Sequence, residues 1–475
     1  MSRAALPTLA LATMLAASAA QASPFLLAMG TLGGTSDLSG LTGTLENGLP
    51  ANILGGLGSG LAYAGGNTFL ALPDRGPNAT SYNSSVDDTV SYINRFQTVN
   101  LSLTRNTSGS GLAYKLSPTL TGTTLLYSPS ALTYGSGTAY GLPSGAPAQN
   151  TSGKNYFTGR SDNYGTGTSG NPTDARFDPE SIRVSNDGKS VFISDEYGPY
   201  VRQFNRSTGA LEKTFTLPAN LDVANKAPTG AAEISGNASG RTANKGMEGL
   251  SITPDGKTLV GIMQAALIQD AGNKSTKKMV RIVTIDIATG ATHEYGYILT
   301  AGSGVSDVLA VNDHEFLVDE RDGAGLGGDP SNAPVKQVYK IDLAGATDIT
   351  NLTGKDAAAA AVGKTQFLDV AGLLESQGGL SPDQVTSKIE GLSFGQDLTI
   401  DGTLTHTLYV SNDNDFVPGT AGPNQFFVFG VTDADLPGYV AQQISAVPLP
   451  KSLPLFAAAL GGLGLLGWRR KAGRA

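Results

Sequence analysis

The sequence has no cysteine, a single tryptophan and three histidines, and only 15% of its 475 residues are charged. The absence of cysteine excludes disulfides and thiol chemistry. There are 32 lysines and arginines against 40 aspartates and glutamates, and the resulting net charge of −8 argues against nucleic acid as a partner. None of the histidines belongs to an R-H-G phosphatase motif or an H-E-x-x-H zinc site. What the chain does have is 62 glycines and a recurring pattern of acids.

The pattern is most complete in FDPESIRVSNDGKSVFISDEYG, residues 177–198. An alternating apolar run, an Asp-Gly turn and a second apolar run predict a β-hairpin. A hairpin brings its two open ends to the same side. We therefore expect Glu180, at its start, to lie near Asp195 and Glu196, at its end.

The same hairpin recurs along the chain, with acids at its open ends. The other copies are residues 59–77 with Asp74 and Arg75, 245–264 with Glu248, 305–322 with Asp307 and Asp319-Glu320-Arg321, and 388–416 with Glu390 and Asp413. Each copy is followed by a further strand, and a sixth unit is expected within residues 112–175. Repeated multi-strand units indicate a radial array. The fold class predicted is all-β, a single closed β-propeller of about six blades, with an N-terminal strand pairing with the C-terminal blade.

The two ends of the chain have signals of their own. Residues 1–22 predict a signal peptide, with Arg3, an apolar run and an Ala-Gln-Ala site. The protein is therefore expected to be exported, with the propeller domain at 23–440. Residues 441–475 combine a Val-Pro-Leu-Pro motif, an apolar run that is slightly short for a bilayer, and a basic end.

This C-terminal segment resembles the PEP-CTERM sorting signals of Gram-negative bacteria, although Leu449 stands where that family usually has glutamate. The resemblance implies an apolar helix that anchors the chain transiently in the membrane, and an exosortase-type processing enzyme as a partner. The mature protein would then lie in the periplasm, at the cell surface or outside the cell. A plain single-pass membrane anchor is the alternative.

The acids of the repeats are expected on one face of the propeller, around the mouth of its channel. Carboxylates that converge in a low-dielectric funnel need cations, and hard oxygen ligands suit Ca²⁺. The expected metal ligands are Glu180, Asp195, Glu196, Glu248, Asp319, Glu320, Glu390 and Asp413. Five of these, Glu180, Asp195, Glu248, Asp319 and Glu390, are also the candidate catalytic residues. The alternative is that these acids form structural salt bridges or cap turns.

Basic residues alternate with the acids, and together they could hold an anionic ester. The candidate substrate-binding residues are Asp74, Arg75, Lys245, Arg321 and Lys388. The sequence also contains Gly391-Leu392-Ser393-Phe394-Gly395, which fits G-x-S-x-G. That motif needs a strand-turn-helix setting. Because Ser393 aligns with a strand in another repeat, we expect it to be a strand residue and not a nucleophile.

Six motifs resemble the phytase-like domain family, which is also described as having esterase-like activity. They are DRGPN at 74–78, FDPESI at 177–182, SDEYGP at 194–199, KGMEGL at 245–250, VDERDG at 318–323 and KIEGLS at 388–393. The resemblance implies a β-propeller and a calcium-dependent phosphoester hydrolase. Two functions are expected on this basis. One is an exported hydrolase of phosphate or other esters. The other is a non-catalytic surface or extracellular-matrix propeller that binds polysaccharide or protein.

Overall fold

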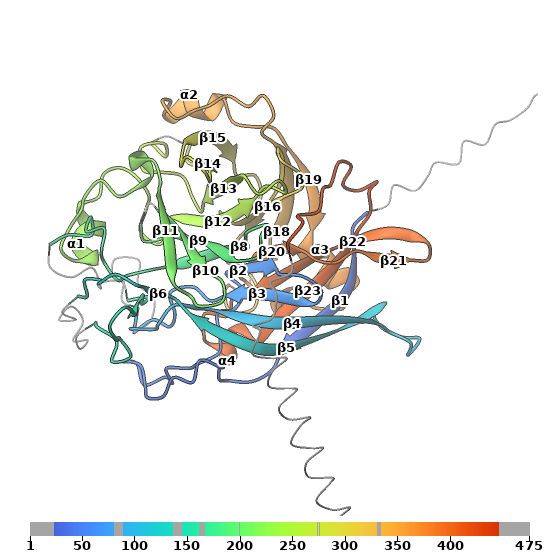
Figure 1. Ribbon diagram of the computed structural model, residues 1–475. Coiled ribbons are helices and arrows are strands. Elements are labelled where there is room, and N and C mark those ends of the chain that lie inside the picture. The colour runs from blue at the N-terminus through green and yellow to red at the C-terminus, as the bar shows by residue number, and fades with distance from the viewer. Residues whose placement is uncertain are drawn as a thin grey trace, which may run out of the picture.

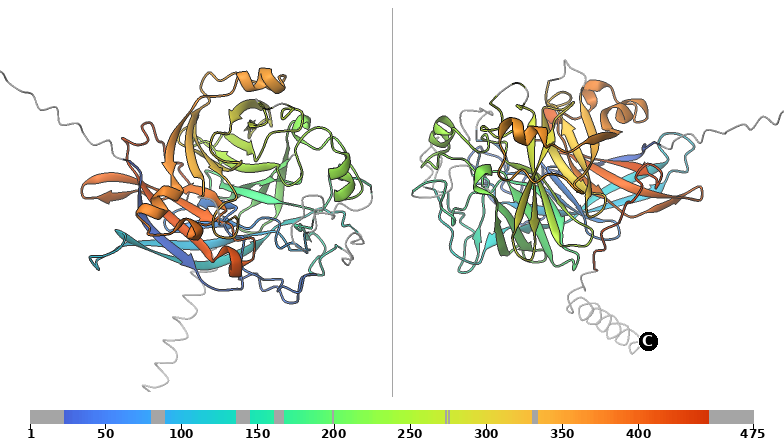
Figure 2. Two further views of the ribbon diagram at one scale, coloured as in Figure 1. Left: turned by 180° about the vertical axis from the view of Figure 1, so that it is seen from behind. Right: turned by 90° about the horizontal axis from the view of Figure 1, so that it is seen from above.

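The computed structural model describes residues 23–79, 89–135, 145–160, 167–198, 200–272, 274, 276–329 and 334–445. Within these ranges the chain forms five antiparallel blades. The innermost strands of neighbouring blades contact one another in a closed circuit, so all five blades surround one axis. Figures 1 and 2 show the strands of the blades fanning outward from this centre. The prediction of an all-β propeller is confirmed.

In blades 1 to 4 the strands run from the axis outward in chain order. Blade 1 contains β2 (Gly60–Tyr63), β3 (Thr68–Leu72), β4 (Arg95–Arg105) and β5 (Tyr114–Leu125). Blade 2 contains β8 (Pro179–Val184), β9 (Ser190–Asp195), β10 (Tyr200–Asn205) and β11 (Leu211–Thr216). Blade 3 contains β12 (Met247–Ile252), β13 (Thr258–Met263), β14 (Met279–Asp286) and β15 (Thr292–Ile298). Blade 4 contains β16 (Gly304–Ala310), β17 (Glu315–Arg321), β18 (Lys336–Asp342) and β19 (Lys364–Asp369).

Blade 5 closes the ring with strands from both ends of the domain. It contains β20 (Ile389–Phe394), β22 (Thr403–Asn412), β23 (Asn424–Val431) and, outermost, β1 (Phe25–Leu32), while β21 (Leu398–Ile400) pairs with β22 alone. Strand β1 pairs antiparallel with β23, from Phe25 opposite Gly430 to Leu32 opposite Asn424. The expected pairing of an N-terminal strand with the C-terminal blade is therefore confirmed. This pairing covers the edge of β23 with hydrogen bonds and closes the ring.

The expectation of about six blades is wrong, because the structure has five. The described parts of this region, residues 112–135, 145–160 and 167–175, do not form a blade of their own. They supply β5 as the outermost strand of blade 1 and a two-stranded ribbon of β6 (Tyr127–Ser128) and β7 (Asn155–Tyr156). This region is rich in Gly, Ser, Thr and Asn and lacks the paired apolar runs that fill the inner positions of the other blades.

In the described part of the chain the helices are few and short, and they lie in the connections. They are α1 (Gly230–Gly236), α2 (Gly354–Ala359), α3 (Val370–Ser376) and α4 (Pro418–Ala421), with 3-10 turns at Ala219–Leu221 and Pro382–Gln384. None of the helices in the described ranges is long and apolar enough to cross a membrane. The predicted signal peptide (1–22) and residues 446–475 of the predicted sorting segment lie outside the described residues. Both assignments stay predictions.

The innermost strands β8, β12 and β20 are buried along their whole length, and β2 and β16 are buried at all but one residue each. Their apolar side chains pack between neighbouring blades. Leu250 of blade 3 and Val308 of blade 4 belong to one buried cluster, and Leu392 belongs to another that joins blades 4 and 5. Each fully buried side chain of this size contributes about 1.5–3 kcal/mol of hydrophobic stabilisation. The centre is thus rigid, and it fixes the residues at both ends of the channel.

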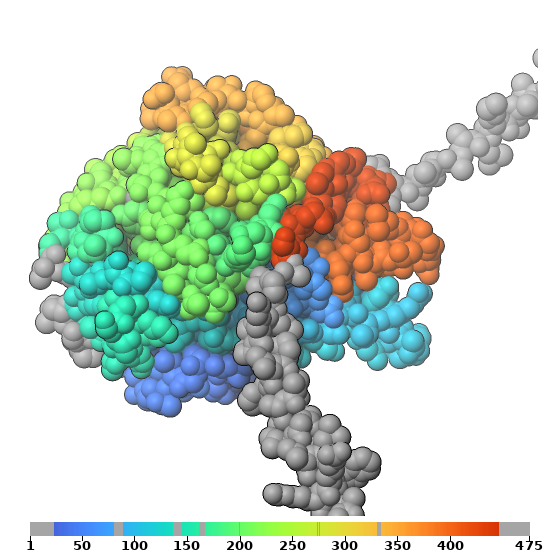
Figure 3. Space-filling model, in the orientation of Figure 1, coloured from blue at the N-terminus to red at the C-terminus, as the bar shows by residue number. Residues whose placement is uncertain are grey.

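The C-terminal stretch of the described chain covers the end of the channel where the inner strands finish, here called the distal face. The Val440 amide donates to the Val311 carbonyl, and Nε2 of Gln442 donates to the Val184 carbonyl, each at 2.8 Å. Figure 3 shows this segment in red, between the green atoms of blades 2 and 3 and the blue and orange atoms of blades 1 and 5. The opposite end of the channel is therefore a separate opening, and the side chains at that end face it.

Candidate active site

Four of the five innermost strands begin with an irregularity in their pairing, close to the channel mouth. In blades 2 to 5 the pairing with the second strand shifts near the start of the innermost strand, which is the mark of a β-bulge. Matching these registers, and that of blade 1, places five residues at one equivalent position. This first ring consists of Ser59, Glu180, Glu248, Ser306 and Glu390.

A second ring comes from the ends of the second strands, which return to the same face. The same registers make Asp74, Glu196, Gln264, Arg321 and Asp413 equivalent. The three glutamates of the first ring and all five residues of the second line one cavity of about 200 Å³. Arg75, Asn244, Lys245 and Lys388 complete its wall. We call this opening the acidic cavity. The hairpin geometry therefore does gather acids at one mouth, as predicted.

Below the first ring the blades approach too closely for most side chains. A Cβ added to Gly249 would lie 2.8 Å from the backbone nitrogen of Val308 in the next blade. One added to Gly391 would lie 2.9 Å from the carbonyl oxygen of Gly58. The repeated Glu-Gly-Leu motif can therefore be explained by steric fit and packing. Its glutamate faces the cavity, its glycine permits contact between blades, and its leucine fills the core.

Three carboxylates meet in blade 2 at the wall of the acidic cavity. Oxygens of Asp178, Glu180 and Glu196 lie within 4.8 Å of one another. Arg75 partly compensates them, since its guanidinium lies 3.0 Å from Asp178 and 4.0 Å from Glu196. The Arg75 guanidinium also bonds to the Asn244 side-chain oxygen. Asp178 is held further by a hydrogen bond from the backbone nitrogen of Arg75 at 3.1 Å.

Ionising these carboxylates together costs free energy, because they are buried and lie close to one another. Burial raises the pKa of Glu180 well above its ordinary value, and the nearby charges of Glu248 and Asp178 raise it further. Burial, with help from Asp178, raises the pKa of Glu196 to about 7. Near neutral pH this group therefore takes up either protons or a cation.

A second group of carboxylates lies across the cavity, where blade 1 meets blade 5. Oxygens of Asp74, Asp413 and Asp415 lie within 4.8 Å of one another. Here the chain supplies its own cation, because the Lys388 ammonium lies 2.7 Å from Asp413 and 2.5 Å from Asp415. Burial raises the pKa of Asp413 to about 7 despite this ammonium. Lys388 thus compensates part of the charge of this group, as Arg75 does for the group around Glu180.

The remaining acids of the first ring share one guanidinium. Arg321 lies 2.5 Å from Glu390 and 3.8 Å from Glu248, and its Nε donates to the Ser306 hydroxyl at 2.6 Å. Glu248 also accepts a hydrogen bond from Gln264 at 2.9 Å. Arg321 thus joins blades 3, 4 and 5 at the cavity wall.

The donor set of the acidic cavity fits a hard divalent cation. Six carboxylates and four cationic side chains line it, and Asp178 adds a carboxylate directly behind its wall. In the described chain no donor reaches Oε2 of Glu248, which is buried. Carboxylate oxygens are the ligands that Ca²⁺ prefers. Asp178, Glu180 and Glu196 are the residues best placed to hold such an ion.

Comparison with known families identifies the family of this chain. The model of the family described as "Phytase-like: Esterase-like activity of phytase" matches residues 52–416. The chain belongs to the phytase-like family. The matched range holds every residue of both rings, and it leaves out β1 and β23 of blade 5.

The chain is also similar to parts of other proteins. An "Uncharacterized secreted protein" of Arthroderma benhamiae is 35% identical over 134 residues, a match that spans 25% of this chain and 26% of that protein. Among solved structures, hydrazine synthase of Kuenenia stuttgartiensis is similar at 11% identity and a TM-score of 0.32, over 80% of this chain and 81% of that one. A luciferin-regenerating enzyme is similar at 9% identity and a TM-score of 0.30, over 83% and 97%. Neither likeness extends to activity.

Three predicted site residues of the phytase-like domain lie outside the acidic cavity. Asp195 and Glu320 occupy one equivalent position, a single residue before the second ring, so the pleat turns both toward the body of the blade. There Asp195 bonds to Arg202, and Glu320 bonds to Lys364. Asp319 is fully buried in β17, and neither of its oxygens accepts a hydrogen bond from the described chain. Burial raises the pKa of Asp319 well above its ordinary value.

The structure also adds residues that sequence analysis missed. Asp178 and Asn244 both bond to Arg75, Gln264 binds Glu248, and Asp415 binds Lys388. Asp178 stands two residues before Glu180 in the FDPESI motif, so that motif contained the signal. Gln264 could have been found only by matching the strand registers, because it is not acidic.

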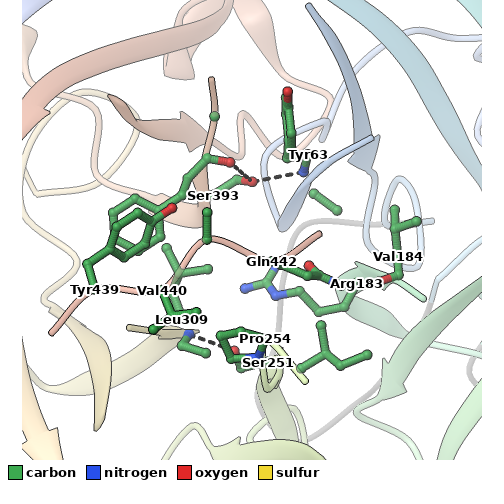
Figure 4. Close-up of a pocket in the computed structure, with 16 residues that line it drawn as sticks. Tyr63, Arg183, Val184, Ser251, Pro254, Leu309, Ser393, Tyr439, Val440 and Gln442 are labelled. Atoms are coloured by element: carbon green, nitrogen blue, oxygen red, sulfur yellow. Dashed lines mark hydrogen bonds between the residues drawn. The ribbon is translucent and has the colours of Figure 1, made fainter. Parts of the chain in front are cut away.

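Ser393 lies in strand β20, as predicted. It lines a pocket at the distal face, shown in Figure 4, where its hydroxyl accepts a hydrogen bond from the Tyr63 amide at 2.8 Å and donates to the Phe394 carbonyl. His406 lies buried in β22. It contacts Asp397 at 2.8 Å and Asp433 at 2.9 Å.

Most of the predicted site residues line the acidic cavity, and this cavity is therefore the candidate active site.

Proposed function

We propose that this protein is an exported, calcium-dependent hydrolase of phosphate or related esters. The observation that supports this most is the convergence of Glu180, Glu196, Glu248 and Glu390 with Arg75 and Lys245 in one cavity. An acidic cavity on its own would repel an anionic ester. A bound divalent cation reverses that field, and the basic side chains can then orient the anion.

The residues divide into three roles in this proposal. Asp178, Glu180 and Glu196 hold the cation. Lys245, which is exposed at the rim, and Arg75 orient the acidic group of the ester. Bound Ca²⁺ would supply Lewis-acid polarisation of the phosphoryl oxygen.

In this proposal, carboxylates with raised pKa values accept and donate the protons of the reaction. Glu248 has a buried oxygen without a donor, and burial raises its pKa well above the ordinary value. As general base, Glu248 accepts a proton from water while the water oxygen bonds to phosphorus and the ester P–O bond breaks. The alcohol leaves with a proton from a protonated carboxyl outside the cation site, such as Asp413, whose pKa is about 7. One proton is taken up and one is given, so the site regains its starting charge after proton exchange.

Export is the second part of the proposal. The Arthroderma benhamiae relative is described as secreted, and residues 1–22 have the pattern of a signal peptide. We propose that residues 441–475 then act as a PEP-CTERM-type signal for an exosortase-type enzyme. Mass spectrometry of the protein from its host should show a start near Ser23 and loss of the segment after Pro450. An intact tail would leave only the simple anchor.

The decisive experiment is an assay of the purified protein on a panel of phosphate and carboxylate esters, with Ca²⁺ and with a chelator. We expect hydrolysis that the chelator abolishes and that Glu248→Gln reduces by roughly 10²–10⁴-fold. Hydrolysis that survives the chelator would refute the calcium dependence. Absence of hydrolysis, together with binding to polysaccharide, would favour the non-catalytic surface propeller.

A further inference from the structure

A second, larger cavity opens beside the acidic cavity. Its volume is about 550 Å³, and it shares Arg75, Asn244 and Lys388 with the acidic cavity. The two openings therefore lie side by side. Its lining includes four apolar residues, Leu49, Pro77, Phe416 and Val417, which we call the apolar shelf, beside Asn47, Asn78 and Asp415. Pro77 and Phe416 are buried, so Val417 supplies most of the exposed apolar surface of the shelf.

The shelf is held by an unusual backbone. Asp415 and Phe416 have φ angles of 50° and 58°, in the left-handed region that an aromatic residue rarely adopts. The Phe416 ring is fixed by Tyr92, with ring centroids 5.1 Å apart, and by close contact with Gly55 and Gly56. Strain of this kind persists only where the surroundings enforce it, and it concentrates at functional sites.

The effect of this conformation is to place two unlike side chains next to each other. Asp415 turns to the Lys388 ammonium at the cavity rim. Val417, two residues on, is 48% exposed on the shelf. Exposed apolar side chains of this size are uncommon in the described chain, and this one borders the candidate active site.

We propose that the apolar shelf binds the alcohol part of the substrate, and that this part is an aryl or alkyl group rather than a phosphorylated polyol. This inference rests on the proposed function, because it assumes that the acid part of the ester lies in the acidic cavity. The shared wall of Arg75 and Lys388 sets the boundary between the two parts. An ester whose charge is confined to one end matches this division. A polyanion would place further negative charge beside Asp415 and against Leu49, Pro77 and Val417.

The test is calorimetric binding of phenylphosphonate and methylphosphonate, two non-hydrolysable probes, to the purified protein with Ca²⁺. We expect phenylphosphonate to bind about tenfold more tightly than methylphosphonate. Val417→Ser should remove most of that difference. Leu404→Ser is the matched control, because Leu404 is also exposed, at 46%, but lies in the β21–β22 hairpin away from the shelf. It should leave both affinities unchanged.

Equal affinities for the two probes, or an equal effect of Val417→Ser on both, would overturn the inference. Tighter binding of inositol hexakisphosphate than of phenylphosphonate would overturn it as well. Failure of the proposed function gives a different result. In that case phenylphosphonate binds preferentially through Val417, which supports the shelf, yet no ester of the panel is hydrolysed.

Discussion

The guanidinium of Arg183 in blade 2 donates a hydrogen bond of 2.7 Å to Oδ2 of Asp307 in blade 4, at the point where the inner strands meet. Arg183 also donates to the Leu61 carbonyl of blade 1. Asp307 accepts from the amide of Leu392 in blade 5 at 2.9 Å and from that of Leu250 in blade 3 at 3.4 Å. One ion pair therefore touches all five blades. It also separates the acidic cavity from the pocket at the distal face, which Arg183 lines.

The first prediction concerns this pair. Asp307→Asn keeps the shape of the side chain but leaves the buried Arg183 charge uncompensated. Breaking a buried pair in this way should lower the free energy of unfolding by about 3–5 kcal/mol. Urea denaturation with a chelator present measures the change. Asp187→Asn is the control, because Asp187 pairs with Lys189 on the surface and exposed pairs contribute little. A loss in Asp307→Asn no larger than in the control would show that the pair does not hold the ring.

The second prediction concerns the contact between blades. Gly249→Ala adds a Cβ that would lie 2.8 Å from the Val308 nitrogen, so blades 3 and 4 must move apart. Overpacking of this kind should cost about 1–3 kcal/mol of unfolding free energy. Gly363→Ala is the matched control, because a Cβ there meets nothing within 4 Å. Thermal denaturation of both variants compares them. Equal melting temperatures would contradict the close approach of the blades at Gly249.

The fold and the place of the site followed from the sequence because the hairpins repeat. Alternating apolar runs around Asp-Gly turns fixed which hairpin ends share a face. The blade count was overestimated because the loop-rich region after blade 1 was taken for a unit. No local pattern distinguishes a weak blade from an outer strand with long connections.

The register of the strands was the second feature that could not be predicted from the sequence. Aligning acid with acid made Asp307 the counterpart of Glu180, whereas the strand pairing makes Ser306 its counterpart. An error of one residue reverses the side of the strand on which a side chain lies. Asp195 and Glu320 were assigned to the cavity for the same reason. Aligning the buried apolar positions, Ile182 with Val308, would have corrected the first ring.

The third prediction is a pH dependence of stability in the absence of calcium. The pKa values of Glu180 and Glu248 are raised well above ordinary, and those of Glu196 and Asp413 are raised to about 7. In the unfolded chain these groups titrate near pH 4. The folded protein therefore binds more protons between about pH 4 and pH 7, and its stability falls as the pH rises through that window. His406, whose pKa is raised by two aspartates, acts in the same direction.

With a chelator present, the urea midpoint should therefore be lower at about pH 8 than at about pH 5. Glu196→Gln removes one of the titrating groups and should reduce the difference in unfolding free energy by roughly 1–3 kcal/mol. Glu375→Gln, on helix α3 outside the cavity, is the control for the same chemical change. A midpoint that rises with pH in wild type would mean that the cavity acids are compensated already.

The last prediction separates the acids that face the cavity from those that do not. If Asp178, Glu180 and Glu196 hold Ca²⁺, the ion stabilises the folded state by mass action, about 2.7 kcal/mol at a hundredfold excess over the dissociation constant. Glu180→Gln removes a ligand and also relieves repulsion. It should melt close to wild type, or above it, in chelator, and should gain little from Ca²⁺.

Asp195→Asn gives the opposite combination. Asp195 contacts Arg202 and the backbone nitrogen of Asp178, outside the cavity wall. Its neutralisation should lower the melting temperature in chelator, yet the calcium shift should stay near that of wild type. Differential scanning calorimetry of the three proteins, with and without Ca²⁺, measures both quantities. If Asp195→Asn loses the calcium shift while Glu180→Gln keeps it, the cation lies elsewhere. If wild type shows no shift, the acids of the two rings are structural, and the calcium-dependent hydrolase loses its main support.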